Sequence, residues 1–316
     1  MITLSRRART FWARHVKPTR IFVSSFVGVI LAGGFLLWLP FSAAQGRLRF
    51  VDALFTSTSA VCVTGLVVVD TGKELSSIGQ VITLLLIQIG GLGIITFSTV
   101  FFVLMGRSIP FKEREIVQSS FMHTPGRNFG VIAKYVLLFA FTTELVGTLV
   151  LWFRFAWDFP PERALYLAVY HAISAFNNAG FSLFSDSLVR YQADGIVNLT
   201  IMMLIVHGGI GFIVQYELLA KWRGTQKRLS LHTKLVLVTT AILIAAGGLF
   251  FYFFERNHIL KGLPAGAKLL ISLFQSVTPR TAGFNTVDIG SVTNASLLLL
   301  IVLMFVGASP GSTGGG

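Results

Sequence analysis

The sequence predicts an all-α polytopic membrane protein, and three observations carry this prediction. Of the 316 residues, 53% are hydrophobic and 12% are charged, whereas a soluble domain carries about a quarter charged residues. The mean hydropathy is +0.74. Six apolar stretches are each long enough to cross a bilayer, which takes about 20 helical residues. These features exclude a water-soluble enzyme, and the single cysteine, Cys62, excludes an internal disulfide.

The six predicted spans follow one another with two kinds of connection. The spans are 21–41, 76–106, 135–153, 195–216, 235–254 and 289 onward. Some of the connections are polar loops. The other three, 53–69, 164–185 and 267–287, are apolar but too short or too polar at their centres to cross the bilayer. We therefore expect these three segments to enter the membrane and return to the same side.

The positive charges predict the orientation of the spans. Sixteen of the 26 Lys and Arg residues cluster before the first span, after the second and after the fourth. The positive-inside rule therefore places the N-terminus 1–20 and the linkers 107–130 and 221–232 in the cytoplasm. This topology explains the net charge of +13 without a nucleic-acid partner. A cleaved signal peptide is a second interpretation of the N-terminus, but its apolar run exceeds the usual length of about 7–15 residues.

Three internal repeats organise the chain, in 21–106, 131–220 and 233–316, each with a span, a re-entrant segment and a second span. The re-entrant segments read VCVTGLVVVD, NNAGFSLFSD and RTAGFNTVD, and they align on Gly65, Gly180 and Gly283. In each, a small residue precedes the glycine and an apolar residue follows it. An aspartate comes five or six residues later, at Asp70, Asp186 and Asp288.

A glycine-centred extended segment at membrane depth is typical of an ion path. Non-helical backbone is tolerated there when it is buried in protein or lines a watery cavity. Glycine adopts backbone angles that aim its carbonyl inward, and it has no side chain to block the path. Several such segments around one axis form rings of carbonyl oxygens that replace the hydration shell of potassium. The residues predicted to bind potassium in this filter are Cys62, Val63, Thr64, Gly65, Asn177, Asn178, Ala179, Gly180, Arg280, Thr281, Ala282 and Gly283.

The surroundings of the predicted filter also favour a cation. The half-membrane helix before each glycine would point its partly negative C-terminal end toward the axis. We expect Asp70, Asp186 and Asp288 at the outer mouth, where they would concentrate cations. The alternative is that they are ordinary exposed carboxylates of loops.

Four stretches, TSTSAVCVTGLVVVDTG, SAFNNAGFSLFSDSL, SVTPRTAGFNTVDIG and GASPGSTGGG, resemble the Trk/Ktr/HKT superfamily of potassium-uptake proteins, most of all the bacterial Ktr-type membrane subunit. The resemblance implies four helix–pore loop–helix repeats around a pseudo-fourfold pore in the cell membrane. It also implies a homodimer and a cytosolic ring of nucleotide-binding regulatory subunits as partner. Potassium is then the substrate, with no covalently bound cofactor. Coupling to sodium or protons stays open.

Within this resemblance, the glycine-rich end of the sequence corresponds to a flexible gating loop beneath the filter. Five Gly and one Pro in ten residues do not continue a stable helix, at about 1 kcal/mol per Gly and 3 per Pro relative to Ala. The alternative is a disordered tail. Because three of the four repeats are present, we expect a fragment that does not conduct ions. The predicted gating residues are Gly307, Ser309, Pro310, Gly311, Ser312, Thr313, Gly314, Gly315 and Gly316.

Several polar and small residues in the spans allow two interpretations. Glu144 is either functional or hydrogen-bonded to a neighbouring helix, and His171 and His207 are expected to be packing residues. We expect the Arg280 side chain to point away from the path and to brace the loop. The glycine pairs 90–91 and 208–209 are expected at close helix contacts rather than at hinges.

The functional alternative is a secondary transporter of another small cation or solute, which would also use broken helices. An enzyme is not expected, because no nucleophile–base or metal-binding pair lies within the spans.

Overall fold

The computed structural model describes residues 18–104 and 129–314. The expected N-terminal segment up to residue 17, most of the linker 107–130, and Gly315 and Gly316 lie outside the described residues. Within the described ranges the secondary structure is helical, apart from one isolated bridge between Ala43 and Leu75. This agrees with the all-α prediction.

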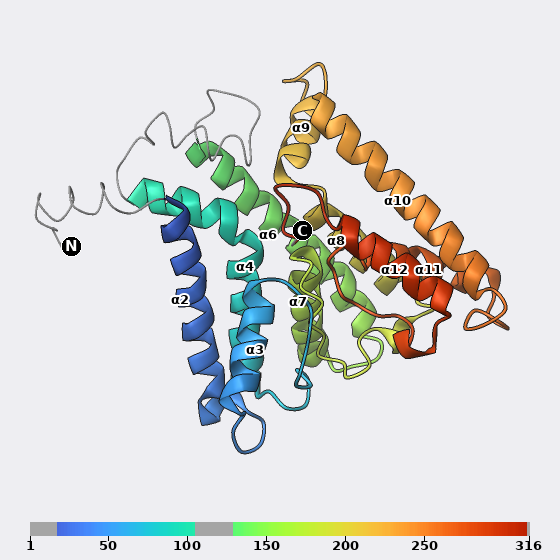
Figure 1. Cartoon of the computed structure of the whole chain (residues 1–316), viewed down its shortest axis with the longest axis horizontal. Coiled ribbons are helices and arrows are strands. Elements are labelled where there is room, and N and C mark those ends of the chain that lie inside the picture. Colours follow the sequence, from blue (N-terminus) through green and yellow to red (C-terminus); the bar gives the residue numbers. More distant parts are fainter. Residues whose placement is uncertain (1–17, 105–128, 315–316) are drawn as a thin grey trace, which may run out of the picture.

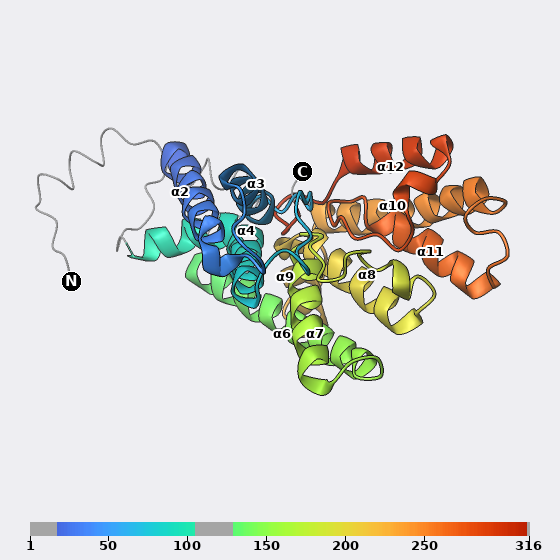
Figure 2. The same ribbon diagram turned by 90° about the horizontal axis from the view of Figure 1, so that it is seen from below.

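The described helices fall into three groups that repeat one order of elements. The first holds α2 (Pro18–Trp38), α3 (Phe50–Val61) and α4 (Ser77–Leu104). The second holds α6 (Phe129–Phe155), α7 (Pro161–Phe176), α8 (Gly195–Gly209) and α9 (Phe212–Trp222). The third holds α10 (Leu231–Glu255), α11 (Ala265–Val277) and α12 (Asn294–Val306). Seen from below, the groups lie around the point where the C-terminal segment ends (Figure 2).

Each group contains one short helix followed by an extended segment. The short helices α3, α7 and α11 have 12, 16 and 13 residues, too few to cross a bilayer. Each packs most extensively on the first helix of its own group, namely α2, α6 and α10. The arrangement agrees with the expected order of span, re-entrant segment and span.

Among the residues with described side chains, two helices are long and apolar enough to cross a membrane, Tyr135–Phe155 and Leu231–Glu255. The pair α8 and α9 would be a third span, but the two helices meet at 101°. The continuous span predicted over 195–216 is therefore wrong. The chain turns at Gly211, whose φ of +90° is a left-handed backbone angle that suits glycine.

Side-chain caps fix where several helices begin. The Asp194 carboxylate accepts the N–H of Val197 at the start of α8. The Thr293 hydroxyl does the same for Ser296 at the start of α12. Such caps satisfy N–H groups that have no partner within the helix, and each contributes about 1 kcal/mol. Each of these second helices thus starts at a defined position after its extended segment.

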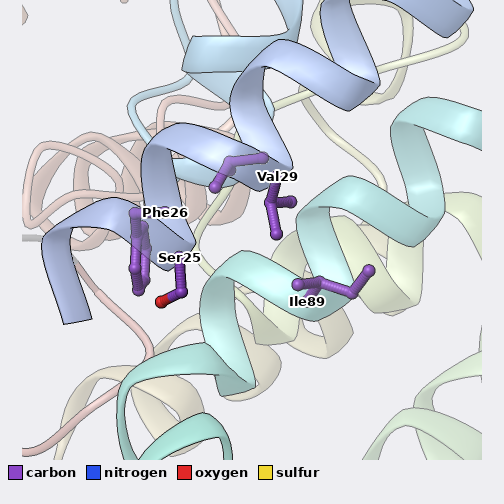
Figure 3. A pocket seen from close by; sticks show the side chains of 5 residues that line it. Ser25, Phe26, Val29 and Ile89 are labelled. Carbon is purple, nitrogen blue, oxygen red and sulfur yellow. The ribbon is translucent and has the colours of Figure 1, made fainter. Parts of the chain in front are cut away.

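A small pocket between α2 and α4 is lined by Ser25, Phe26, Val29, Val61 and Ile89 (Figure 3). Four of these five side chains are apolar, so the pocket offers few ligands to an ion. It therefore does not account for the polar motifs of the sequence, which gather elsewhere.

Candidate functional site

The three glycine motifs meet in space although they lie more than 100 residues apart in sequence. A Cβ placed on Gly65 would lie 3.1 Å from the Ala179 carbonyl oxygen and 3.6 Å from the Cα of Gly283. A Cβ on Gly180 would lie 3.0 Å from the same Cα. We call residues 62–65, 177–180 and 280–283 the first, second and third filter segments. The structure brings all three into contact.

The three filter segments share an unusual backbone. The glycines have φ of +75°, +71° and +79°. The residue two positions before each glycine also has positive φ, at Val63, Asn178 and Thr281, with 54°, 56° and 78°. The residue between them does not. Because reversing φ at every second residue turns alternate peptide planes, the carbonyls of such a segment can face one side, as in a ring of ion ligands.

This backbone is strained, because left-handed angles cost a residue other than glycine about 1–2 kcal/mol. Val63 and Thr281 are β-branched, for which such angles are rarest. Strain of this kind persists only where the surroundings hold the chain in place, and it gathers at functional sites.

A hydroxyl at the end of each short helix forms a hydrogen bond with the backbone next to its filter segment. Ser59, Ser174 and Thr278 donate to the carbonyl of the residue that follows the filter glycine, at 2.6, 2.8 and 2.6 Å. The backbone carbonyls of the same three residues accept the N–H just before that glycine, at 3.0, 2.8 and 2.9 Å. These hydroxyls were not among the predicted site residues, although each precedes its glycine by five or six residues.

The burial of the segments differs. Asn177, Asn178 and Ala179 are fully buried in the second segment. In the first, Cys62 and Thr64 are exposed. The Cys62 thiol is exposed because the residue caps the C-terminus of α3 and its side chain lies outside the packed core.

Arg280 turns away from the other two filter segments. Its Nε donates to the Gly307 carbonyl at 3.2 Å, and Nη2 lies 3.5 Å from the Thr240 hydroxyl on α10. This geometry agrees with the expectation that Arg280 braces a loop. The loop in question is the glycine-rich segment after α12.

The glycine-rich segment 307–314 lies against the second filter segment and the break between α8 and α9. The Thr313 hydroxyl lies within hydrogen-bond distance of the Phe176 carbonyl, at 2.9 Å, and of the Asn178 side-chain amide, at 3.0 Å. The Thr313 N–H donates to Gly208, and the Ser309 N–H donates to Gly209.

The same segment also contacts the start of α9 and the third filter segment. Phe212 donates its N–H to the Gly311 carbonyl, and a Cβ on Gly211 would lie 2.8 Å from the Pro310 carbonyl oxygen. A Cβ on Gly314 would overlap the Thr281 hydroxyl. Ser312 has a buried hydroxyl without a hydrogen-bond partner. The segment is therefore packed rather than a free tail as far as residue 314.

The three outer aspartates have local partners. Asp70 accepts the N–H groups of two residues in its own turn, and Asp288 accepts one. Asp186 pairs with Arg190 at 2.9 Å. Burial tends to raise the pKa of Asp186, but the Arg190 hydrogen bonds and charge hold it below its ordinary value. The structure thus does not gather these carboxylates into one cluster.

The other residues that the sequence marked have structural contacts. The buried His171 ring contacts the Leu167 carbonyl at 2.8 Å and the Ser182 hydroxyl at 2.9 Å, and His207 contacts the Met203 carbonyl at 2.7 Å. A Cβ on Gly90 would overlap the Val61 carbonyl, so this glycine is at a close contact as expected. In the pair 208–209, the first glycine is at a close contact and the second is the last residue of α8.

No group of three or more His, Cys, Asp or Glu side chains comes together in the described part of the chain. The oxygen atoms nearest to Gly65 and Gly180 are the backbone carbonyls of Ala179 and Ala282. Such a set suits a weakly hydrated monovalent cation and offers nothing to a reacting substrate.

Comparison with known protein families decides which proteins share this architecture. The family model described as "TrkH: Cation transport protein" matches residues 4–316. The chain belongs to the TrkH family. The TrkH family is a family of transporters and not of enzymes, which confirms both the resemblance and the exclusion of an enzyme.

Curated relatives support the same assignment. "Ktr system potassium uptake protein B" of Bacillus subtilis is 41% identical over 100% of this chain and 70% of its own length. The protein of the same name from Vibrio alginolyticus is 39% identical over 94% and 66%. "Potassium/sodium uptake protein NtpJ" of Enterococcus hirae is 36% identical over 100% and 69%. The chain thus spans about two thirds of the length of these TrkH-family relatives.

A solved structure shares the fold. The potassium transporter TrkH from Vibrio parahaemolyticus superimposes with a TM-score of 0.67 at 21% identity, over 96% of this chain and 59% of that one. The fold class, an all-α polytopic membrane protein of repeated helix–pore loop–helix units, is therefore confirmed.

Proposed function

We propose that this chain is part of the membrane subunit of a Trk/Ktr-type potassium-uptake system, and that the full-length subunit conducts potassium through a filter of backbone carbonyls to which these residues contribute. One observation carries the proposal: three segments with the same alternation of left-handed residues contact one another. The names of the similar proteins from Bacillus, Vibrio and Enterococcus support potassium as the ion. The proposed ligands are carbonyls of residues 62–65, 177–180 and 280–283, in the repeats 21–106, 131–220 and 233–316.

The electrostatics favour a cation in this place. The short helices α3, α7 and α11 end at the filter segments, so each presents its partly negative C-terminal end there. Arg280, the one arginine among the twelve filter residues, directs its guanidinium to the Gly307 carbonyl and so leaves the axis free of a fixed positive charge. Carbonyl rings then supply the oxygen ligands that replace water around potassium.

The test is uptake of rubidium, a potassium tracer, by the full-length protein in proteoliposomes. We expect uptake that potassium inhibits and that sodium inhibits much more weakly. Gly65→Ser should place a hydroxyl beside one carbonyl ring and let sodium compete. Unchanged preference for potassium over sodium in this variant would show that residue 65 is not part of the filter.

A second candidate function is a secondary transporter built on broken helices, which the 101° break between α8 and α9 favours. The two candidate functions differ in whether potassium uptake is coupled to the movement of another ion. Rubidium uptake without sodium and without a proton gradient supports the channel-like mechanism. Strict dependence on either ion supports coupled transport.

We further propose that the N-terminus is cytoplasmic in a plasma or inner membrane. The α2–α3 connection and the α9–α10 connection lie at opposite ends of the molecule (Figure 1). Arg47 and Lys227 are exposed in these two connections. In a Cys62→Ala background, Arg47→Cys should react with an impermeant thiol reagent applied to intact cells, and Lys227→Cys should not. The reverse pattern would invert the topology.

The glycine-rich segment 307–316 is proposed as the gate, because residues 307–314 contact the second and third filter segments directly. We also propose a homodimer and a cytosolic nucleotide-binding ring as the regulatory partner. Both rest on the resemblance, and the "Ktr system" names of the relatives are consistent with a system of several subunits. Light scattering of the purified protein, with and without the ring subunit, tests both assemblies.

A further inference from the structure

A buried carboxylate lies directly behind the second filter segment. Glu144, in the middle of α6, is 4% exposed. Its Oε1 accepts from the amide of Asn177 at 3.1 Å and from that of Gln88 at 3.0 Å. The Asn177 amide also donates to Gln88 Oε1 at 2.9 Å and to the Ile173 carbonyl at 2.9 Å. The helices α4 and α6 and the second filter segment thus meet at the Glu144 carboxylate.

The cluster leaves Asn177 no freedom to turn. Its Oδ1 is buried without a hydrogen-bond partner, and a Cβ on Gly91 of α4 would overlap that oxygen. The NH2 group of the Asn177 amide faces hydrogen-bond acceptors, and its oxygen packs against Gly91, which has no side chain. Only one orientation of the amide therefore fits. Asn177 directly precedes Asn178, the left-handed residue of the second filter segment. The orientation of Asn177 therefore sets the start of that strained path.

The other two units hold their short helices differently. Ser57 donates to the Ile30 carbonyl, and Ser276 donates to the Ile244 carbonyl. Each isoleucine comes three residues before a glycine of its span, as Glu144 comes three before Gly147. A charged side chain in place of isoleucine is costly inside a membrane, where it marks a functional position. No ion pair among the described residues involves Glu144, and the amides of Gln88 and Asn177 donate hydrogen bonds to its carboxyl.

From this geometry we propose that Glu144 is a positioning residue for ion selectivity, which acts through Asn177 on the second filter segment. The inference rests on the proposed function. A fixed carboxylate sets the tilt of the Asn177 amide, and with it the spacing of the carbonyls that follow. Selectivity for potassium over sodium depends on that spacing, whereas uptake as such needs only an open path.

The test uses rubidium uptake by the full-length protein in proteoliposomes, with sodium and potassium as competitors. In Glu144→Gln, the new side-chain NH2 group faces the N–H donors of the neighbouring amides, so one charge-assisted hydrogen bond is lost. A loss of this size corresponds to about a tenfold change, and we expect the preference for potassium over sodium to fall by that factor. The double variant Glu144→Gln/Gln88→Glu swaps the two side chains and keeps one carboxylate within hydrogen-bond distance of the Asn177 amide. It should restore most of the preference.

The matched control is Glu255→Gln. Glu255 is also a fully buried glutamate, hydrogen-bonded by Thr293 and Ser296, but it contacts no filter residue. We expect this variant to lose thermal stability and to keep its ion preference. The inference is overturned if Glu144→Gln keeps its preference, if the exchange restores nothing, or if Glu255→Gln loses the preference equally. If the wild-type protein takes up no rubidium, the proposed function fails and not this assignment.

Discussion

The first and second filter segments follow the same backbone path in different surroundings. Both alternate left-handed residues and both are held by a serine of the preceding helix. The second is fully buried at Asn177, Asn178 and Ala179, and it receives hydrogen bonds or contacts from α4, α6 and the glycine-rich segment. The first exposes Cys62 and Thr64. The same path therefore recurs in the two repeats, whereas its burial depends on contacts with elements outside the filter segment.

The largest expected difference between the two segments concerns their glycines. Alanine at either position pays the cost of a left-handed angle, about 1–2 kcal/mol. At Gly180 the added Cβ would also lie 2.5 Å from the Ala282 carbonyl oxygen, whereas at Gly65 the nearest atom is 3.1 Å away. We expect Gly180→Ala to abolish rubidium uptake and Gly65→Ala to reduce it partly. Equal losses in proteoliposomes with matched protein content would remove the distinction.

The serines behind the segments should give the next largest difference. Ser174→Ala leaves the carbonyl of the buried Phe181 without a partner, at a cost of about 1–3 kcal/mol. Ser59→Ala frees the carbonyl of the exposed Leu66, which water can satisfy. The melting temperature in detergent should therefore fall clearly for Ser174→Ala and little for Ser59→Ala. A larger fall for Ser59→Ala would contradict the burial argument.

A smaller effect concerns thiol reactivity. Native Cys62 is exposed and should react with a small maleimide on the purified protein. Ala179→Cys in a Cys62→Ala background occupies a fully buried position and should react at least about tenfold more slowly. Thr64→Cys in the same background serves as the exposed control. Rapid labelling at position 179 would show that the second segment opens readily.

Part of this architecture could be read from the sequence, because it depends on residues close together in the chain. The glycines at 65, 180 and 283 are required by backbone angles that few other residues adopt, so their spacing indicates the segments directly. The hydropathy likewise predicted the helices. These signals are local, and each repeat carries its own copy.

The rest depends on contacts between distant residues. Glu144 meets Gln88 and Asn177, which are 56 and 33 positions away. The role that we propose for Glu144 follows only once α4, α6 and the end of α7 are placed relative to one another. The bend between α8 and α9 was missed because apolar residues continue on both sides of Gly211. The sequence places the three aspartates at equivalent positions of the motifs, but it does not show that each has a hydrogen-bond partner in its own loop.

The smallest expected effect distinguishes the aspartates that follow the first two segments. Asp70 accepts backbone N–H groups, which the amide oxygen of Asn can also accept, and its ion pair with Lys73 is long, at 3.9 Å, so Asp70→Asn should change stability little. Asp186 instead pairs with Arg190, and both side chains are substantially exposed, so the pair contributes at most about 1 kcal/mol. The hydrogen bonds and charge of Arg190 hold the pKa of Asp186 below its ordinary value.

The sign of the pH dependence follows from this direction. A carboxyl whose pKa is lower in the folded state stabilises the fold above its unfolded pKa, about 3.9 for Asp, and loses that contribution as the pH falls through the folded value. The melting temperature of the wild-type protein should therefore be slightly higher than that of Asp186→Asn at pH 6. The two melting temperatures should become equal at acid pH. High salt at pH 6 should narrow the gap, because exposed ion pairs are screened. A gap that persists below pH 3, or that salt does not affect, would show that Asp186 acts through packing rather than through its charge.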